Sequence, residues 1–113
     1  AIAYNKNDRH ILIVENNGAI ANMQDDAMVE VVCELGANGP RPMSVGNIPQ
    51  FNLGLLVNQV SCEKLIVDAY FENSYQKALE AFTLNRLIND AKKARKVLDA
   101  LIEANRGMWP ELR

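Results

Sequence analysis

The sequence has few of the residues that build disulfide frameworks or metal centres. Its 113 residues include two cysteines, Cys33 and Cys62, and a single histidine, His10. The three form no Cys-x-x-Cys pair or Cys/His cluster, which argues against a disulfide scaffold and against a structural zinc site. We therefore expect both cysteines to be inert, reduced thiols in a cytoplasmic protein, and His10 to have a structural role.

Long apolar runs and an excess of one charge are also lacking. The longest aliphatic run, Ile11 to Val14, is far below the roughly 20 residues that span a bilayer. Lysine and arginine number 12 against 14 acidic residues, a net charge of −2, which disfavours anionic partners. The basic run from Lys92 to Lys96 is expected to be a solvated helix face, because acidic residues surround it at helical spacing. We predict no nucleic-acid partner and no membrane partner.

Two short strands are expected in the first third of the chain. The run Ile11 to Val14 is bounded by turn-forming residues and predicts a strand over about residues 9–15, buried on both faces. A second strand is predicted over residues 28–32. The following segment, Gly36 to Pro49, contains too much glycine and proline for a helix or a central strand, so we predict a loop with an extended edge around residues 43–45. Long loops of this kind often bind a ligand.

The rest of the chain predicts three helices. Apolar residues recur at three- and four-residue steps from Leu53 to Phe71 and cover more than one side of that helix. Asn73 or Ser74 is expected to cap the second helix, and Asn89-Asp90 the third. The residues expected to face inward are Ala78, Leu79, Phe82 and Leu87, then Ala91, Ala94, Leu98, Leu101 and Ile102. Strands followed by helices indicate an α+β fold.

The opening residues, Ala1 to Tyr4, resemble the last turn of a helix whose start is missing. We therefore expect the chain to be a fragment of a longer protein. The residues themselves supply little catalytic chemistry, since no glycine-rich nucleotide loop is present. Four carboxylates near residue 16 could act as an acid/base pair on a sugar, although surface and helix-start roles are favoured; they are Glu15, Asp25, Asp26 and Glu30.

The segment Asn16-Asn17-Gly18 is the local feature that most favours a binding site. Asn16-Asn17-Gly18 follows the first predicted strand directly, and asparagine and glycine tolerate the positive φ that a sharp turn requires. Loops at strand ends commonly carry binding sites. The residues alone therefore predict one part of a larger fold that contributes a loop to a cleft.

The same residues carry a resemblance to a known family. Residues 16–22, 26–31, 39–40, 48–51 and 63–65 form ungapped blocks that resemble, in order, the C-terminal part of glycoside hydrolase family 4. The likeness extends over essentially all 113 residues and is greatest to the 6-phospho-α-glucosidase branch, which hydrolyses phosphorylated α-glucosides such as maltose 6'-phosphate. The resemblance implies an enzyme that uses NAD and a divalent metal, usually Mn²⁺. Its chemistry is oxidation at C3 of the sugar, elimination, addition of water and return of the hydride.

The resemblance also implies that the chain is a partial domain of a larger α/β enzyme. The catalytic machinery of that enzyme would lie upstream of Ala1, in an absent NAD-binding domain. Residues 1–113 are then a C-terminal fragment of the substrate and oligomerisation domain, inactive alone, with no catalytic, cofactor-binding or metal-binding residue. Tyr4, His10 and the cysteines are given no such role. The substrate-proximal loop is expected at Asn16, Asn17 and Gly18.

Several alternatives stay open. Asn17 favours the α branch, because the 6-phospho-β-glucosidase branch typically has an arginine at this position, in the sequence Asn-Arg-Gly. One position does not exclude that branch or another branch of the family. The resemblance implies a homo-oligomer, and the many-sided apolar helix from Leu53 to Phe71 is the expected packing surface. A stand-alone helical interaction module that associates through the same helix is the rival interpretation.

Overall fold

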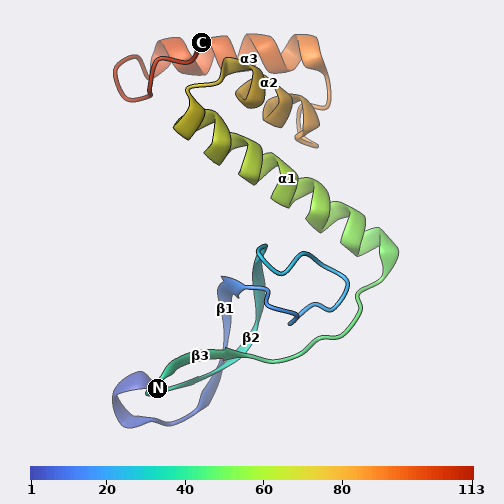
Figure 1. Ribbon diagram of the computed structural model, residues 1–113, viewed down its shortest axis with the longest axis vertical. Helices are drawn as coiled ribbons and strands as arrows, with labels where there is room; N and C mark the ends of the chain where they lie inside the picture. The colour runs from blue at the N-terminus through green and yellow to red at the C-terminus, as the bar shows by residue number, and fades with distance from the viewer. The chain divides into compact units, whose positions relative to one another are not determined.

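A computed structural model describes all residues, 1–113. The chain divides into two compact units, Ala1–Gly54 and Leu55–Arg113. The chain opens with the 3₁₀ turn η1 (Ile2–Tyr4). The elements labelled in Figure 1 are the strands β1 (Asp8–Glu15), β2 (Met28–Gly36) and β3 (Gly39–Pro42), and the helices α1 (Gln50–Glu72), α2 (Tyr75–Leu84) and α3 (Ala91–Ala104). The predicted α+β class, with strands first and three helices after them, is confirmed. None of the helices combines the length and apolarity that a bilayer crossing requires.

The first unit is built on an antiparallel sheet in the order β1-β2-β3. Leu12 lies opposite Val31 in the first pair of strands, and Cys33 lies opposite Pro42 in the second. Burial alternates along β2, as a strand with one covered face requires. The buried apolar residues of this unit are Ala19, Ile20, Met23, Ala27, Val29, Val31 and Cys33. They come from β2 and from the loop that joins it to β1.

The prediction that the first strand is buried on both faces is wrong. Ile11 and Ile13 are 67% and 69% exposed, while Leu12 and Val14 are half-buried. The sheet has one covered face and one open face, so the apolar residues of β1 alternate between the two. A continuous aliphatic run does not show whether one or both faces of its strand are buried, because apolar residues then lie on both faces in either case.

The glycine- and proline-rich segment contains a strand that the sequence analysis missed. β3 pairs with the end of β2, which runs to Gly36 rather than ending at residue 32. Pro40 and Pro42 are tolerated because β3 is at the edge of the sheet, where missing N–H donors break no ladder. Beyond β3, the segment around residues 43–45 is extended, as predicted. The Met43 N–H donates to the Val32 carbonyl at 2.9 Å and the Val45 N–H donates to the Ala19 carbonyl at 2.7 Å.

The second unit packs its helices around a small core. Ala69, Ala78 and Leu98 are buried and are surrounded by partly buried side chains: Tyr75, Leu79, Phe82, Ile102 and Leu112. Two predicted caps are confirmed, since Ser74 accepts from the Lys77 N–H and Asp90 accepts from the Lys93 N–H.

Three residues expected to face inward do not. Leu87 is 96% exposed because α2 ends at Leu84 and Leu87 lies in the turn that follows. Ala91 and Leu101 are also exposed, so the inward face of α3 is narrower than predicted. The many-sided apolar character of α1 is confirmed, because large apolar side chains remain exposed along it at Leu56, Val67, Tyr70 and Phe71.

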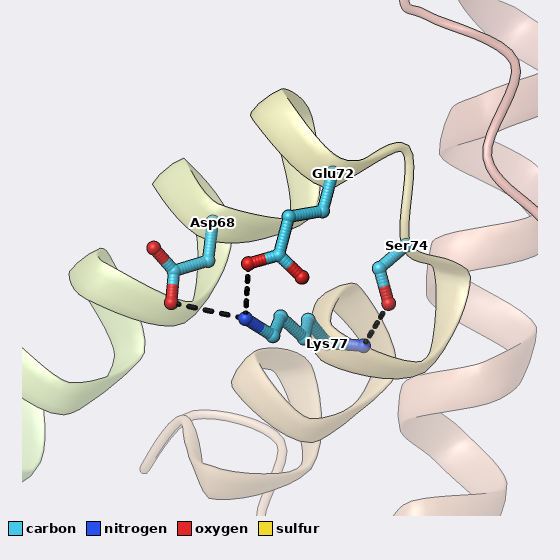
Figure 2. A network of polar contacts seen from close by, with 4 residues as sticks. All are labelled: Asp68, Glu72, Ser74 and Lys77. Atoms are coloured by element: carbon cyan, nitrogen blue, oxygen red, sulfur yellow. Dashed lines mark hydrogen bonds and ion pairs between the residues drawn. The ribbon is translucent and has the colours of Figure 1, made fainter.

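An ion-pair network joins α1 to α2 (Figure 2). The Lys77 ammonium on α2 lies 2.6 Å from a Glu72 carboxylate oxygen and 3.3 Å from one of Asp68, both on α1. The hydrogen bond to Glu72 is the main reason that the pKa of Lys77 is raised. Together with the Ser74 cap, this network fixes the turn between the two helices.

Replacing Lys77 by methionine tests this network. The pKa of Lys77 is raised in the folded chain, so its contribution to stability is fully present below the ordinary lysine pKa of about 10.4 and is lost as the pH rises through the raised value. We expect K77M to unfold at lower urea concentration than wild type at pH 7, with the difference disappearing at strongly alkaline pH. Lys92→Met, on the exposed face of α3, is the control. Equal effects of the two variants at every pH would contradict this account.

Candidate functional site

The loop between β1 and β2 is folded around the side chain of Asn16. Asn16 is the only fully buried polar residue of the chain, with 0% exposure. Its amide nitrogen donates to the carbonyl oxygens of Ile20, Met23 and Gln24 at 3.0, 3.2 and 3.1 Å, and its amide oxygen accepts from the Ile20 N–H at 2.7 Å. The amide is therefore fully used inside the loop and shapes the loop rather than reaching out of it.

The next two residues point the loop outward. Asn17 and Gly18 both have positive φ, 40° and 81°, and both are exposed. No atom lies within 4 Å of a Cβ built on Gly18, so glycine is suited to this position by its backbone conformation and not by lack of space. The Asn17 amide donates to the Glu15 carboxylate at 3.1 Å. This turn thus presents one amide side chain and one unshielded backbone segment to the outside.

The structure joins this loop to the segment after β3. Ala21 N–H donates to the Gly46 carbonyl at 2.9 Å, and the side chain of Asn22 both donates to and accepts from the backbone of Ile48, each at 3.0 Å. The two segments that the sequence analysis singled out separately are therefore one surface. Asn22 was missed as the connecting residue, because an asparagine in a polar loop gives no signal of a partner 26 residues away.

The four carboxylates near this loop lie on the exposed surface. Glu15 is opposite Met28 in the sheet and accepts from Asn17, while Glu30 is opposite Ile13. Asp25 contributes its backbone carbonyl, which accepts from the Asn17 N–H at 3.0 Å. This arrangement favours the surface interpretation over an acid/base pair.

The histidine and the cysteines lie apart from the loop surface. His10 is exposed on β1, opposite Cys33. Cys33 is fully buried and Cys62 is 5% exposed, and both are free thiols. Burial raises the pKa of the Cys62 thiol, which disfavours the reactive thiolate. No three His, Cys, Asp or Glu side chains gather in a geometry that could hold a metal ion.

A concave surface lies within the helical unit. A groove of about 480 Å³ is lined mainly by apolar side chains of α1, α2 and the turn after α2, among them Cys62, Ile66, Phe82 and Ile88. Its polar lining is limited to Gln59, Glu63 and Asn85. It offers shape and apolar contact, but no convergent set of polar groups for catalysis.

Comparisons with known proteins show the family to which the chain belongs. Residues 1–88 match the family 4 glycosyl hydrolase C-terminal domain. The chain is 55% identical over 112 residues, 99% of its length, to the maltose-6'-phosphate glucosidase of Bacillus subtilis strain 168. It spans about a quarter of the length of the curated relatives it matches.

Solved structures give the same result. A 6-phospho-α-glucosidase from gut microorganisms, in complex with NAD and Mn²⁺, superposes with a TM-score of 0.98 at 81% identity, over all of this chain and 26% of that one. The 6-phospho-β-glucosidase of Thermotoga maritima, with NAD and glucose-6-phosphate, gives 0.85 at 30% identity, over 93% of this chain and 26% of that one. The chain therefore belongs to the family 4 glycosyl hydrolases, whose C-terminal domain it matches.

Proposed function

We propose that this chain is the C-terminal part of a 6-phospho-α-glucosidase that hydrolyses phosphorylated α-glucosides such as maltose 6'-phosphate. The observation that carries the proposal is the 55% identity, over nearly the whole chain, to a maltose-6'-phosphate glucosidase. Identity to the solved 6-phospho-β-glucosidase is 30%. In this proposal residues 1–113 belong to the substrate and oligomerisation domain, and a separate domain of the complete enzyme binds NAD.

The cofactors of the complete enzyme are proposed to be NAD and Mn²⁺, as in the complex of the 81%-identical structure. The residues of this chain do not fit either group. Its His, Cys, Asp and Glu side chains form no metal-binding cluster, and it carries no glycine-rich dinucleotide loop. We therefore assign no step of the reaction to a metal or nicotinamide held by this chain.

The contribution of this chain is proposed to be the loop that contains Asn17 and Gly18. A hydroxyl-rich, phosphorylated sugar is bound through many hydrogen bonds, and an exposed amide beside an unshielded backbone turn can supply them. Asn16 is proposed to be a positioning residue, because both ends of its side-chain amide are hydrogen-bonded to the loop backbone. The hydrogen bonds between the Asn22 side chain and the Ile48 backbone hold the segment after β3 against this loop.

The partners follow from this proposal. The complete enzyme takes a phosphorylated disaccharide as substrate and assembles as a homo-oligomer. Two free, buried cysteines suit a reducing compartment, which supports a cytoplasmic location.

The substrate class can be tested with chromogenic α- and β-glucoside 6-phosphates. We expect the complete enzyme, supplied with NAD, Mn²⁺ and reductant, to hydrolyse the α-linked compound with a kcat/KM at least tenfold higher than that for the β-linked compound. That ratio corresponds to a difference of about 1.4 kcal/mol in transition-state binding. The 113-residue chain should release no chromophore under the same conditions. Preference for the β-linked compound, or turnover by the chain alone, would overturn the proposal.

The loop can be tested with paired asparagine variants in the complete enzyme. Asn17→Ala should raise KM for the phosphoglucoside roughly three- to tenfold, the cost of one hydrogen bond, and should lower the melting temperature no more than Asn89→Ala does, because alanine meets the same backbone strain at both positions. Asn16→Ala should cost about 3 kcal/mol of stability, because it strands several backbone groups of the loop. Asn89→Ala, another exposed asparagine with positive φ, is the matched control. The loop assignment fails if Asn17→Ala and Asn89→Ala leave KM equally unchanged.

A further inference from the structure

The turn between α1 and α2 contains two backbone groups that neither helix satisfies. Asn73 takes the left-handed conformation in which many helices end, with a φ of 54°, and the next N–H, that of Ser74, donates back to the Ala69 carbonyl at 2.9 Å. Ser74 also caps α2 with its side chain. The Asn73 carbonyl and the Tyr75 N–H are left over, since the first N–H groups of a helix have no partner within it.

Both of these groups bind the backbone of Arg113. The Arg113 N–H donates to the Asn73 carbonyl at 2.7 Å, and the Tyr75 N–H donates to the Arg113 carbonyl at 3.0 Å. The guanidinium takes no part in these bonds and lies 3.7 Å from the Glu111 carboxylate. A residue that follows α3 thus completes the turn that precedes α2.

Residues 107–113 form the strap that brings Arg113 to this turn. Gly107 has a φ of 82°, and the chain loops back along α3 after that helix ends (Figure 1). Leu112 packs against the core cluster in which the three helices meet, made of Ala69, Ala78 and Leu98. α1 contributes only an alanine to that cluster, and an alanine buries little apolar area. The strap therefore adds a large apolar side chain where α1 supplies a small one.

Tyr75 links the strap to α3 as well. Its N–H is bonded to the strap, and its hydroxyl donates to a carboxylate oxygen of Asp99 on α3 at 2.7 Å. We propose that the strap holds the end of α1 to the α2–α3 pair, so that the three helices open as one unit while the strap is bound. When it is released, α1 and the α2–α3 pair open separately. This role is independent of the proposed reaction, because the contacts that support it all lie within residues 69–113.

Two substitutions at Arg113 test the proposal in the complete protein that carries this chain. Arg113→Pro removes the N–H that donates to Asn73, whereas Arg113→Ala keeps both backbone hydrogen bonds. In wild type, the Ser74 and Tyr75 amides should have exchange protection equal within about threefold, because one opening exposes both. We expect R113P to reduce the protection of the Tyr75 amide about tenfold while the Ser74 amide keeps its own, and R113A to change neither.

Leu112→Ala and Ile102→Ala separate the effect of the strap from that of the core. Both remove a partly buried aliphatic side chain that packs on the same cluster, one from the strap and one from α3. L112A should make the Tyr75 amide exchange about tenfold faster than the Ser74 amide, and I102A should affect the two amides equally.

Four outcomes would each overturn the proposal. They are unequal protection of the two amides in wild type, an unchanged Tyr75 amide in R113P, equal behaviour of L112A and I102A, and loss of protection at both amides together in R113P. The last result would mean that the strap is an inseparable part of one core.

Discussion

The interaction on which the loop surface depends is the burial of one neutral amide. An amide removed from water must find hydrogen-bond partners or destabilise the fold by several kcal/mol, and Asn16 finds all of them in the backbone of its own loop. That requirement fixes the backbone between β1 and β2, sets the left-handed conformations of Asn17 and Gly18, and brings the loop against Gly46 and Ile48. The outward-facing groups are thus held by a residue that does not itself face outward.

This separation of roles suits a chain that spans about a quarter of the length of the curated relatives it matches. The described residues contain no metal cluster and no activated nucleophile, and their two thiols are buried. What they supply is a rigid loop and a helix with apolar residues on several sides. Both are surfaces for contact with another part of the protein or with a ligand, which is the contribution proposed above for this chain.

Much of the fold was predictable because local chemistry decided it. The Ser74 and Asp90 caps, the helix periodicities and the Asn-Asn-Gly turn each depend on neighbouring residues, and the structure confirms them. The errors arose where contacts between residues far apart in the sequence determine the local structure. The run Ile11 to Val14 lies on a sheet with one open face and is therefore buried on one side only, and β3 forms among prolines because β2 offers it an edge. The amide contacts of Asn16 and Asn22 were equally hidden, since a polar loop residue does not indicate which carbonyl it will bind.

The central claim is that the Asn16 side chain organises this loop, and the exchange rate of the Ile20 amide tests it most directly. This N–H donates to the Asn16 amide oxygen at 2.7 Å and lies in a segment with no strand or helix of its own. The account predicts protection comparable to that of amides bonded between β1 and β2, with the protection lost in Asn16→Ala while the sheet amides retain theirs. Exchange of the Ile20 amide at the rate of a free loop in the wild-type protein would contradict it.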